Sequence, residues 1–164
     1  MDEMRIQISE WLDKVDSLDA AAETAETLKS LRDVGRRYEN LISYARRIVQ
    51  TRLDICTELK DPSPEGMLVS VVAPRSEPSR IAERHVEVEL SEDDLEAADG
   101  YLRDLVGGDR SHSLDLLSTS QLASYRDRLQ TGERTISNVR RQIHERLDLL
   151  GSELVRRYQS KPLA

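Results

Sequence analysis

The sequence lacks phenylalanine and contains one tryptophan, five tyrosines and only seven glycines in 164 residues. Sandwiches, barrels and doubly wound sheets need β-branched and aromatic residues to fill their cores, so this composition disfavours them. Charged residues make up 34% of the chain and apolar residues 38%, a balance that is typical of long amphipathic helices. The sequence therefore predicts an all-α fold.

Cysteine occurs once, at Cys56, which excludes a disulfide framework within the chain and a cysteine-rich metal site. His85, His112 and His144 are scattered and do not form a metal-ligand cluster with this cysteine, so we expect no metal. No apolar run approaches the ~20 residues that a membrane span needs, and the first residues lack a secretory pattern. These absences favour a cytoplasmic protein that does not enter a membrane.

The net charge of −7 disfavours direct binding to nucleic acid or to an acidic membrane surface, and it is compatible with a basic protein partner. The chain contains no GxxxxGK[ST], GxGxxG or GxSxG motif. P-loop hydrolysis, dinucleotide binding and α/β-hydrolase chemistry therefore lack their motifs. We expect a protein that is not an enzyme.

Proline divides the chain into three regions. Four of the five prolines lie within residues 61–90, which we interpret as a proline-rich connector. Residues 1–60 have the pattern of an N-terminal helical region, in which Gly35 marks either a bend or a close approach of another element. Residues 91–164 form the third region.

The third region contains two capping-box signals, Ser91 with Asp94 and Ser118 with Gln121. They predict a short helix followed by a long one. Neither of the two long helices of the chain is stable alone, so their apolar stripes must meet each other or a partner. The fold that we expect is an antiparallel coiled-coil-like hairpin of two long helices with additional short helices.

An internal repeat links the first and third regions. Residues 39–54 align with residues 133–148 at an offset of 94, and eight of the sixteen aligned positions are identical. A repeat of two copies at so long a period indicates a pseudo-twofold arrangement of two helices rather than a solenoid.

Each copy places five polar residues on one face of its helix, because an α-helix turns by about 100° per residue. A charged helix face is commonly just a solvated surface. Two copies that keep these polar residues, while neighbouring outer positions differ, favour a binding site instead. The residues are Glu39, Ser43, Arg46, Gln50 and Asp54 in the first copy, and Glu133, Ser137, Arg140, His144 and Asp148 in the second.

The chemistry of this set suits a compact ligand that carries both guanine and phosphate. Arginine donates to guanine O6 and N7 and to phosphate oxygens, and serine hydroxyls also donate to phosphate. Carboxylates accept from guanine N1–H and N2–H₂, whereas they repel an extended phosphate backbone. A structural helical-hairpin adaptor, whose charged stripes are only surface, is the alternative.

The first stripe, E-x₃-S-x₂-R-x₃-Q-x₃-D, resembles the signature of the RsiG family of anti-sigma factors, and the second departs from it only by His144. This resemblance implies that all ten stripe residues bind cyclic di-GMP, as an interlocked pair of two molecules. It also implies that the loaded protein sequesters a sigma factor of the WhiG/flagellar class, as in sporulation control. Two motifs in one chain imply that a single copy suffices for the ligand.

The arginines of the stripes suggest how the ligand acts on the partner. We expect Arg46, Arg47, Arg140 and Arg141 to repel each other across the two helices in the free protein. Ligand phosphates then neutralise them, order the helix pair and tighten its binding to the sigma factor.

Overall fold

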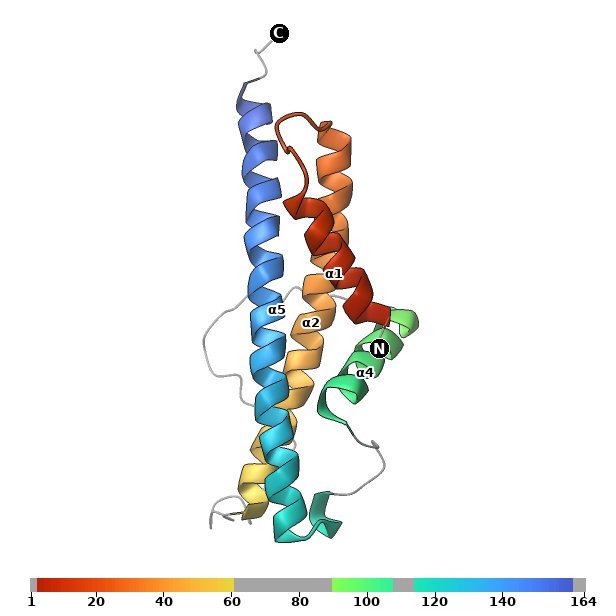
Figure 1. The fold of residues 1–164 in the computed structure, drawn as a ribbon, viewed down its shortest axis with the longest axis vertical. Coiled ribbons are helices and arrows are strands. Elements are labelled where there is room, and N and C mark those ends of the chain that lie inside the picture. Colours follow the sequence, from red (N-terminus) through yellow and green to blue (C-terminus); the bar gives the residue numbers. More distant parts are fainter. Residues whose placement is uncertain (1–2, 61–89, 108–113, 161–164) are drawn as a thin grey trace, which may run out of the picture.

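The computed structural model describes residues 3–60, 90–107 and 114–160, which form four α-helices, one 3₁₀ turn and no strand (Figure 1). The predicted all-α class is confirmed. The proposed proline-rich connector falls almost entirely on residues 61–89, which lie outside the described residues. The elements are α1 (Glu3–Asp16), α2 (Ala25–Lys60), α4 (Glu92–Val106), the 3₁₀ turn η1 (Leu114–Leu116) and α5 (Thr119–Gln159).

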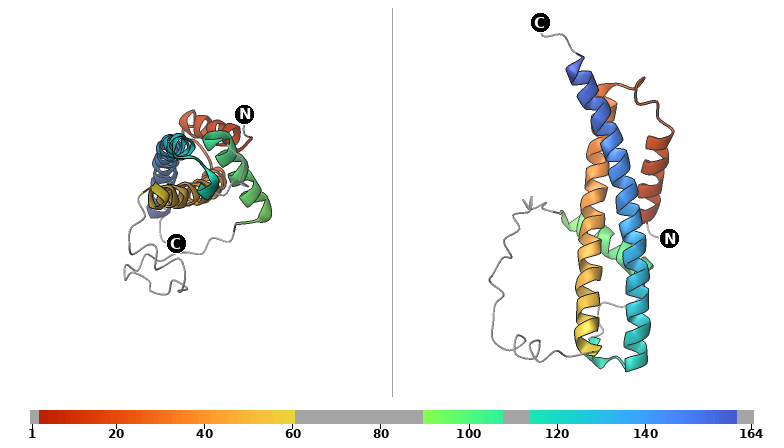
Figure 2. Two further views of the ribbon diagram at one scale, coloured as in Figure 1. Left: turned by 90° about the horizontal axis from the view of Figure 1, so that it is seen from below. Right: turned by 90° about the vertical axis from the view of Figure 1, so that its left-hand side faces the viewer.

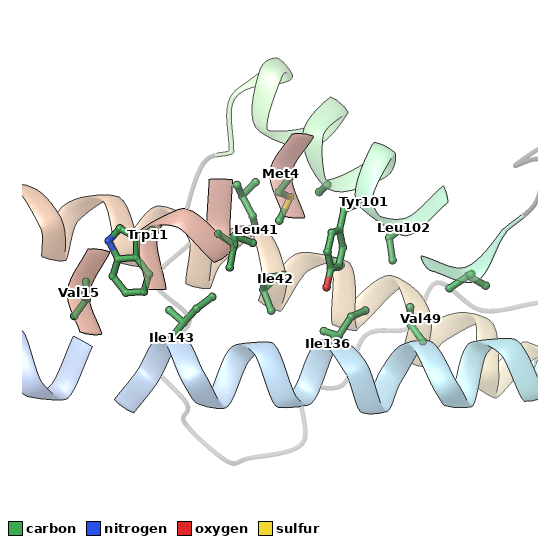
Figure 3. Packing of buried hydrophobic residues seen from close by; sticks show 14 of the residues in the cluster. Met4, Trp11, Val15, Leu41, Ile42, Val49, Tyr101, Leu102, Ile136 and Ile143 are labelled. Carbon is green, nitrogen blue, oxygen red and sulfur yellow. The ribbon is translucent and has the colours of Figure 1, made fainter. Parts of the chain in front are cut away.

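Helices α2 and α5 form the long axis of the molecule. They have 36 and 41 residues and lie side by side in opposite directions (Figures 1 and 2). Ile42 and Val49 of α2 and Ile136 and Ile143 of α5 are fully buried, and Figure 3 shows them within the same packed cluster. The pairing removes from water the apolar stripe that each helix could not bury alone.

Helices α1 and α4 pack against this pair and against each other (Figure 2). Trp11 of α1 is buried, and its indole Nε1 donates a hydrogen bond to the carbonyl oxygen of Leu31 at 3.0 Å. Its ring also meets Tyr38 edge to face, with 6.1 Å between the ring centroids. Tyr101 and Leu102 of α4 are buried in the same cluster (Figure 3).

Ion pairs and carbonyl contacts fix the N-terminal helix onto α5. The guanidinium of Arg146 binds the carboxylate of Asp16 through Nε and Nη2, at 3.0 and 2.7 Å. Arg157 donates to the carbonyl oxygens of Ala20, Ala21 and Glu23 in the loop between α1 and α2. This end of the molecule is therefore held by both polar and apolar contacts.

Both predicted capping boxes are present. The backbone N–H of Asp94 donates to Ser91 Oγ, and that of Gln121 donates to Ser118 Oγ. Asp94 also forms an ion pair with Arg37 of α2 at 2.7 Å. The cap of α4 thus fixes this helix to α2 as well as starting it.

Gly35 marks a close approach rather than a bend, because the ring of Trp11 lies against it. A Cβ atom added at Gly35 would overlap with that ring and would lie 2.9 Å from Leu147 Cδ2. We expect Gly35→Ala to lower the free energy of unfolding by about 1–3 kcal/mol, because overpacking outweighs the better helix propensity of alanine. Urea unfolding followed by Trp11 fluorescence measures the change.

Gly151→Ala is the matched control, since an added Cβ at this helical position has no neighbour within 4 Å. This variant should gain up to about 1 kcal/mol from helix propensity alone. Equal effects of the two substitutions would contradict the packing explanation.

Candidate functional site

The two polar stripes face each other across the α2–α5 pair. Arg46 Nε of the first stripe donates to Glu133 Oε1 at 3.1 Å and to Ser137 Oγ at 3.2 Å, both in the second stripe. Ser137 in turn donates to Glu133 Oε1 of its own stripe at 2.8 Å. The arginine of one motif is therefore held by the glutamate and serine of the other.

The same contacts recur with the roles of the helices exchanged. Arg140 Nε donates to Glu39 Oε1 at 3.2 Å and to Ser43 Oγ at 3.0 Å, and Ser43 donates to Glu39 at 2.8 Å. The two copies of the sequence repeat are thus related by a pseudo-twofold axis in the structure. Six of the ten predicted site residues meet at this axis and form a central cluster: Glu39, Ser43, Arg46, Glu133, Ser137 and Arg140.

The pseudo-symmetry is broken where the two motifs differ. His144 Nε2 lies 3.2 Å from Glu39 Oε1, whereas Gln50, its counterpart, is half-buried and makes no hydrogen bond within the described ranges. Burial raises the pKa of Glu39, but hydrogen bonds from Ser43, His144 and Arg140 outweigh burial and bring the pKa below its ordinary value. Glu39 is therefore held as a carboxylate.

Asp54 and Asp148 lie at the two outer ends of the stripes, away from the pseudo-twofold axis. Both are exposed, and neither makes a hydrogen bond to another part of the chain that the structure describes. Their carboxylates are free to accept hydrogen bonds from a ligand. The structure therefore places these two predicted residues on the same stripes without bringing them into the central cluster.

An open depression of about 380 Å³ lies over the central cluster. Its lining consists of Arg46, Ser137, Arg140, Arg141 and His144. The Nε atoms of Arg46 and Arg140 are bonded across the pair, but their terminal Nη atoms make no hydrogen bond within the described residues. The depression presents oriented guanidinium groups, which favour anionic oxygens.

The expected repulsion between Arg46 and Arg140 in the free protein is wrong. Each guanidinium forms an ion pair with a glutamate of the opposite helix, at 3.1 Å to Glu133 and 3.2 Å to Glu39. These contacts hold the two stripes together without a ligand.

The stripes lie on the side of the pair that faces away from α1 and α4. Arg37, which binds α4, and Arg146, which binds α1, each lie two residues from a stripe residue. Two residues correspond to about 160° around a helix axis, so these contacts are on nearly the opposite side from Glu39 and His144. The described helices therefore leave the stripe side uncovered.

A second depression, of about 820 Å³, adjoins the end of the second stripe. Asp148 lines it together with Arg32 and Arg36 of α2 and Arg156 of α5. Arg32 lies outside the predicted set, because the family motif begins only at Glu39. The repeat itself is the signal for it, since Arg126 occupies the equivalent position seven residues before Glu133.

The lowered pKa of Glu39 predicts a pH-dependent contribution to stability. A carboxyl group whose pKa is lower in the folded state stabilises the fold above its unfolded value, here 4.5. That stabilisation is lost as the pH falls below 4.5 and through the lower pKa of the folded state. The difference in unfolding free energy between the wild type and Glu39→Gln should therefore be largest near neutral pH and shrink in acid.

Urea unfolding at several pH values measures this difference, and Glu145→Gln is the control. Glu145 is exposed and pairs with its neighbour Arg146. Its substitution should have little effect at any pH. A difference between wild type and Glu39→Gln that stays constant from pH 7 to pH 3 would contradict the prediction.

Three further features bear on the kind of site. Over residues 3–60, 90–107 and 114–160, no three or more His, Cys, Asp or Glu side chains gather as metal ligands would. In the same ranges, none of the helices combines the length and apolarity of a membrane-spanning segment. Cys56 is buried, and burial raises the pKa of its thiol.

Comparison with known proteins identifies one family. No curated protein and no solved structure matches the chain. The model of the RsiG-like family matches two segments, residues 14–67 and 108–164, which together make up more than half of the sequence and contain both motifs. The chain therefore belongs to the RsiG-like family, and this membership suggests the role of an anti-sigma factor with a sigma factor as its partner.

Proposed function

We propose that this protein is a cyclic di-GMP-responsive anti-sigma factor, and that the ligand binds on the uncovered side of the α2–α5 pair. The observation that carries the proposal is the reciprocal exchange of contacts between the motifs. Arg46 is held by Glu133 and Ser137, and Arg140 by Glu39 and Ser43, so one chain presents both motifs on one face.

We propose that different parts of the ligand bind different parts of the stripes. Phosphate oxygens suit the central depression, where the Nη atoms of Arg46 and Arg140 are unused and Arg141 adds a third positive charge. Guanine bases suit the two ends, where Asp54 and Asp148 can accept from N1–H and N2–H₂. Because the end at Asp54 and the end at Asp148 are related by the pseudo-twofold axis, we expect the site to bind two ligand molecules.

The partner that we propose is a sigma factor of the WhiG/flagellar class, bound when the ligand is present. Binding and release of a nucleotide and a protein require no bond cleavage, so we propose no enzymatic activity, no metal and no direct contact with nucleic acid. The protein would act in the cytoplasm, where RNA polymerase and the second messenger are found.

A structural adaptor is the alternative, and one observation favours it: the Arg–Glu pairs are already satisfied without a ligand. Such an adaptor has no use for the unpaired carboxylates of Asp54 and Asp148 at matching positions on the two stripes. It also leaves the free Nη groups of Arg46 and Arg140 without a role.

Calorimetric titration of the purified chain with cyclic di-GMP tests the proposal, with cyclic di-AMP as the matched control. The titration is done both alone and with the sigma factor present. We expect two molecules of cyclic di-GMP per chain and clearly weaker binding of cyclic di-AMP. No heat from cyclic di-GMP in either condition would contradict the proposal, and equal affinity for both dinucleotides would contradict the assignment of guanine to the aspartates.

A further inference from the structure

The pseudo-twofold repeat extends beyond the family motif to a further pair of arginines. Arg32 precedes Glu39 by seven residues, and Arg126 precedes Glu133 by seven. Seven residues are close to two helical turns, so each arginine lies on the same stripe as the motif that follows it. The repeat therefore keeps an additional guanidinium in line with each motif.

The antiparallel pairing places each of these arginines opposite the aspartate of the other motif. From the contact between Arg140 and Glu39, seven residues back along α2 lead to Arg32, and eight residues forward along α5 lead to Asp148. These two side chains line the same depression of about 820 Å³.

The equivalent step at the other end starts from the contact between Arg46 and Glu133. It leads forward along α2 to Asp54 and back along α5 to Arg126. The positive charge of Arg126 acts on Cys56: burial raises the pKa of the thiol, and Arg126 opposes that rise, which places Arg126 near this end of α2.

The donors of Arg32 and Arg126 are unused in the free chain. Arg32 Nε is buried and has no hydrogen-bond partner among the described residues, in contrast to the bonded Nε atoms of Arg46 and Arg140. Neither Arg32 nor Arg126 makes a hydrogen bond or ion pair in those parts of the chain. A buried donor without a partner is costly, so an acceptor supplied by a ligand would be favourable here.

We infer that Arg32 and Arg126 are further ligand-binding residues, each of which binds a guanine base together with the aspartate of the opposite helix. This inference rests on the proposed function. Arginine donates to O6 and N7 on one edge of guanine, and the aspartate accepts from N1–H and N2–H₂ on the other. A base between α2 and α5 is thus held from both helices at once, by Arg32 and Asp148 at one end and by Arg126 and Asp54 at the other.

The pairing also explains how the site would reject adenine. Adenine carries an amino donor where guanine has O6, so the arginine loses one of its two acceptors. Adenine also lacks the N1–H and N2–H₂ donors that the aspartate needs. A site that leaves polar groups unpaired with the wrong ligand discriminates strongly against it.

Calorimetric titrations of Arg32→Ala, Arg126→Ala and the double variant with cyclic di-GMP and cyclic di-AMP test this inference. Each single substitution should weaken cyclic di-GMP binding by about 5- to 150-fold. It should weaken cyclic di-AMP binding much less, so that the ratio of the two affinities falls. Arg36→Ala is the matched control, because Arg36 lines the same depression one turn later but has Gln130 as its repeat counterpart.

The outcomes separate this inference from the proposed function. If wild type binds cyclic di-GMP and Arg32→Ala binds it equally well, the inference is overturned and the proposed function stands. If Arg32→Ala and Arg36→Ala weaken both dinucleotides by the same factor, the arginine contributes only charge, and base recognition by Arg32 is overturned. Wild type that binds no cyclic di-GMP overturns both proposals.

Discussion

Replacing both Arg46 and Arg140 with alanine is expected to weaken cyclic di-GMP binding by at least about 100-fold. Each guanidinium is fixed through Nε by the opposite motif, and both arginines line the central depression with Nη atoms that make no hydrogen bond within the described residues. Hydrogen bonds from a charged donor contribute about 1.5–3 kcal/mol each, and both are lost together. Calorimetry or fluorescence anisotropy with labelled cyclic di-GMP measures the loss.

The fold should survive this double substitution. The side chains of Arg46 and Arg140 are 35% and 38% exposed, and ion pairs at such positions contribute at most about 1 kcal/mol each. The fully buried Ile42 and Ile136 hold the helix pair independently of them. Circular dichroism and thermal unfolding verify that the variant remains helical.

A control with the same change in charge replaces Arg103 and Arg134 with alanine. Both residues are exposed and neither lies on a stripe. This control should keep the affinity of the wild type. Binding at full affinity by the variant without Arg46 and Arg140 would exclude the stripes as the ligand site.

Local signals in the sequence predicted the local structure well. The capping boxes at Ser91 and Ser118 mark the starts of α4 and α5, because a cap depends only on residues within one turn. The all-α class followed from composition alone. The division of the chain at residues 60 and 91 stays a prediction.

The contacts between elements could not be predicted in this way. The sequence left open whether Gly35 marks a bend or a close approach, because the answer depends on Trp11, 24 residues away in the sequence. The ion pair between Asp16 and Arg146 joins α1 to α5 and has no local signature. Such pairs are decided by how whole helices pack.

The candidate site could be predicted in part: its residues follow from local periodicity, but the contacts between its two halves do not. Helical periodicity placed Arg46 and Arg140 on one face of each helix, but it does not specify which faces meet. The expectation of repulsion therefore failed, because Glu39 and Glu133 lie opposite the arginines and pair with them. Arg32 was not predicted, because it precedes the first residue of the family motif, Glu39, by seven residues, whereas the structural repeat includes it.

Cyclic di-GMP is expected to tighten the binding of the sigma factor. Relief of repulsion between arginines cannot be the cause of this tightening. Arg46 already pairs with Glu133, and Arg140 with Glu39, so the stripes are held together without ligand. Ligand bound on the uncovered side of the α2–α5 pair would instead become part of the surface that contacts the partner. Its phosphates add negative charge to a protein of net charge −7, which favours a basic surface on the sigma factor.

Coupling between the binding of cyclic di-GMP and the binding of the sigma factor is reciprocal and typically about 5- to 150-fold. The sigma factor should therefore tighten cyclic di-GMP binding by the same factor. Anisotropy titrations of labelled sigma factor at several concentrations of cyclic di-GMP measure the coupling. The variant without Arg46 and Arg140 is the informative comparison: it should bind the sigma factor as the free wild type does, and added ligand should leave that affinity unchanged. Equal affinity of the wild type with and without ligand would leave a constitutive binder, and weaker affinity with ligand would reverse the direction of the switch.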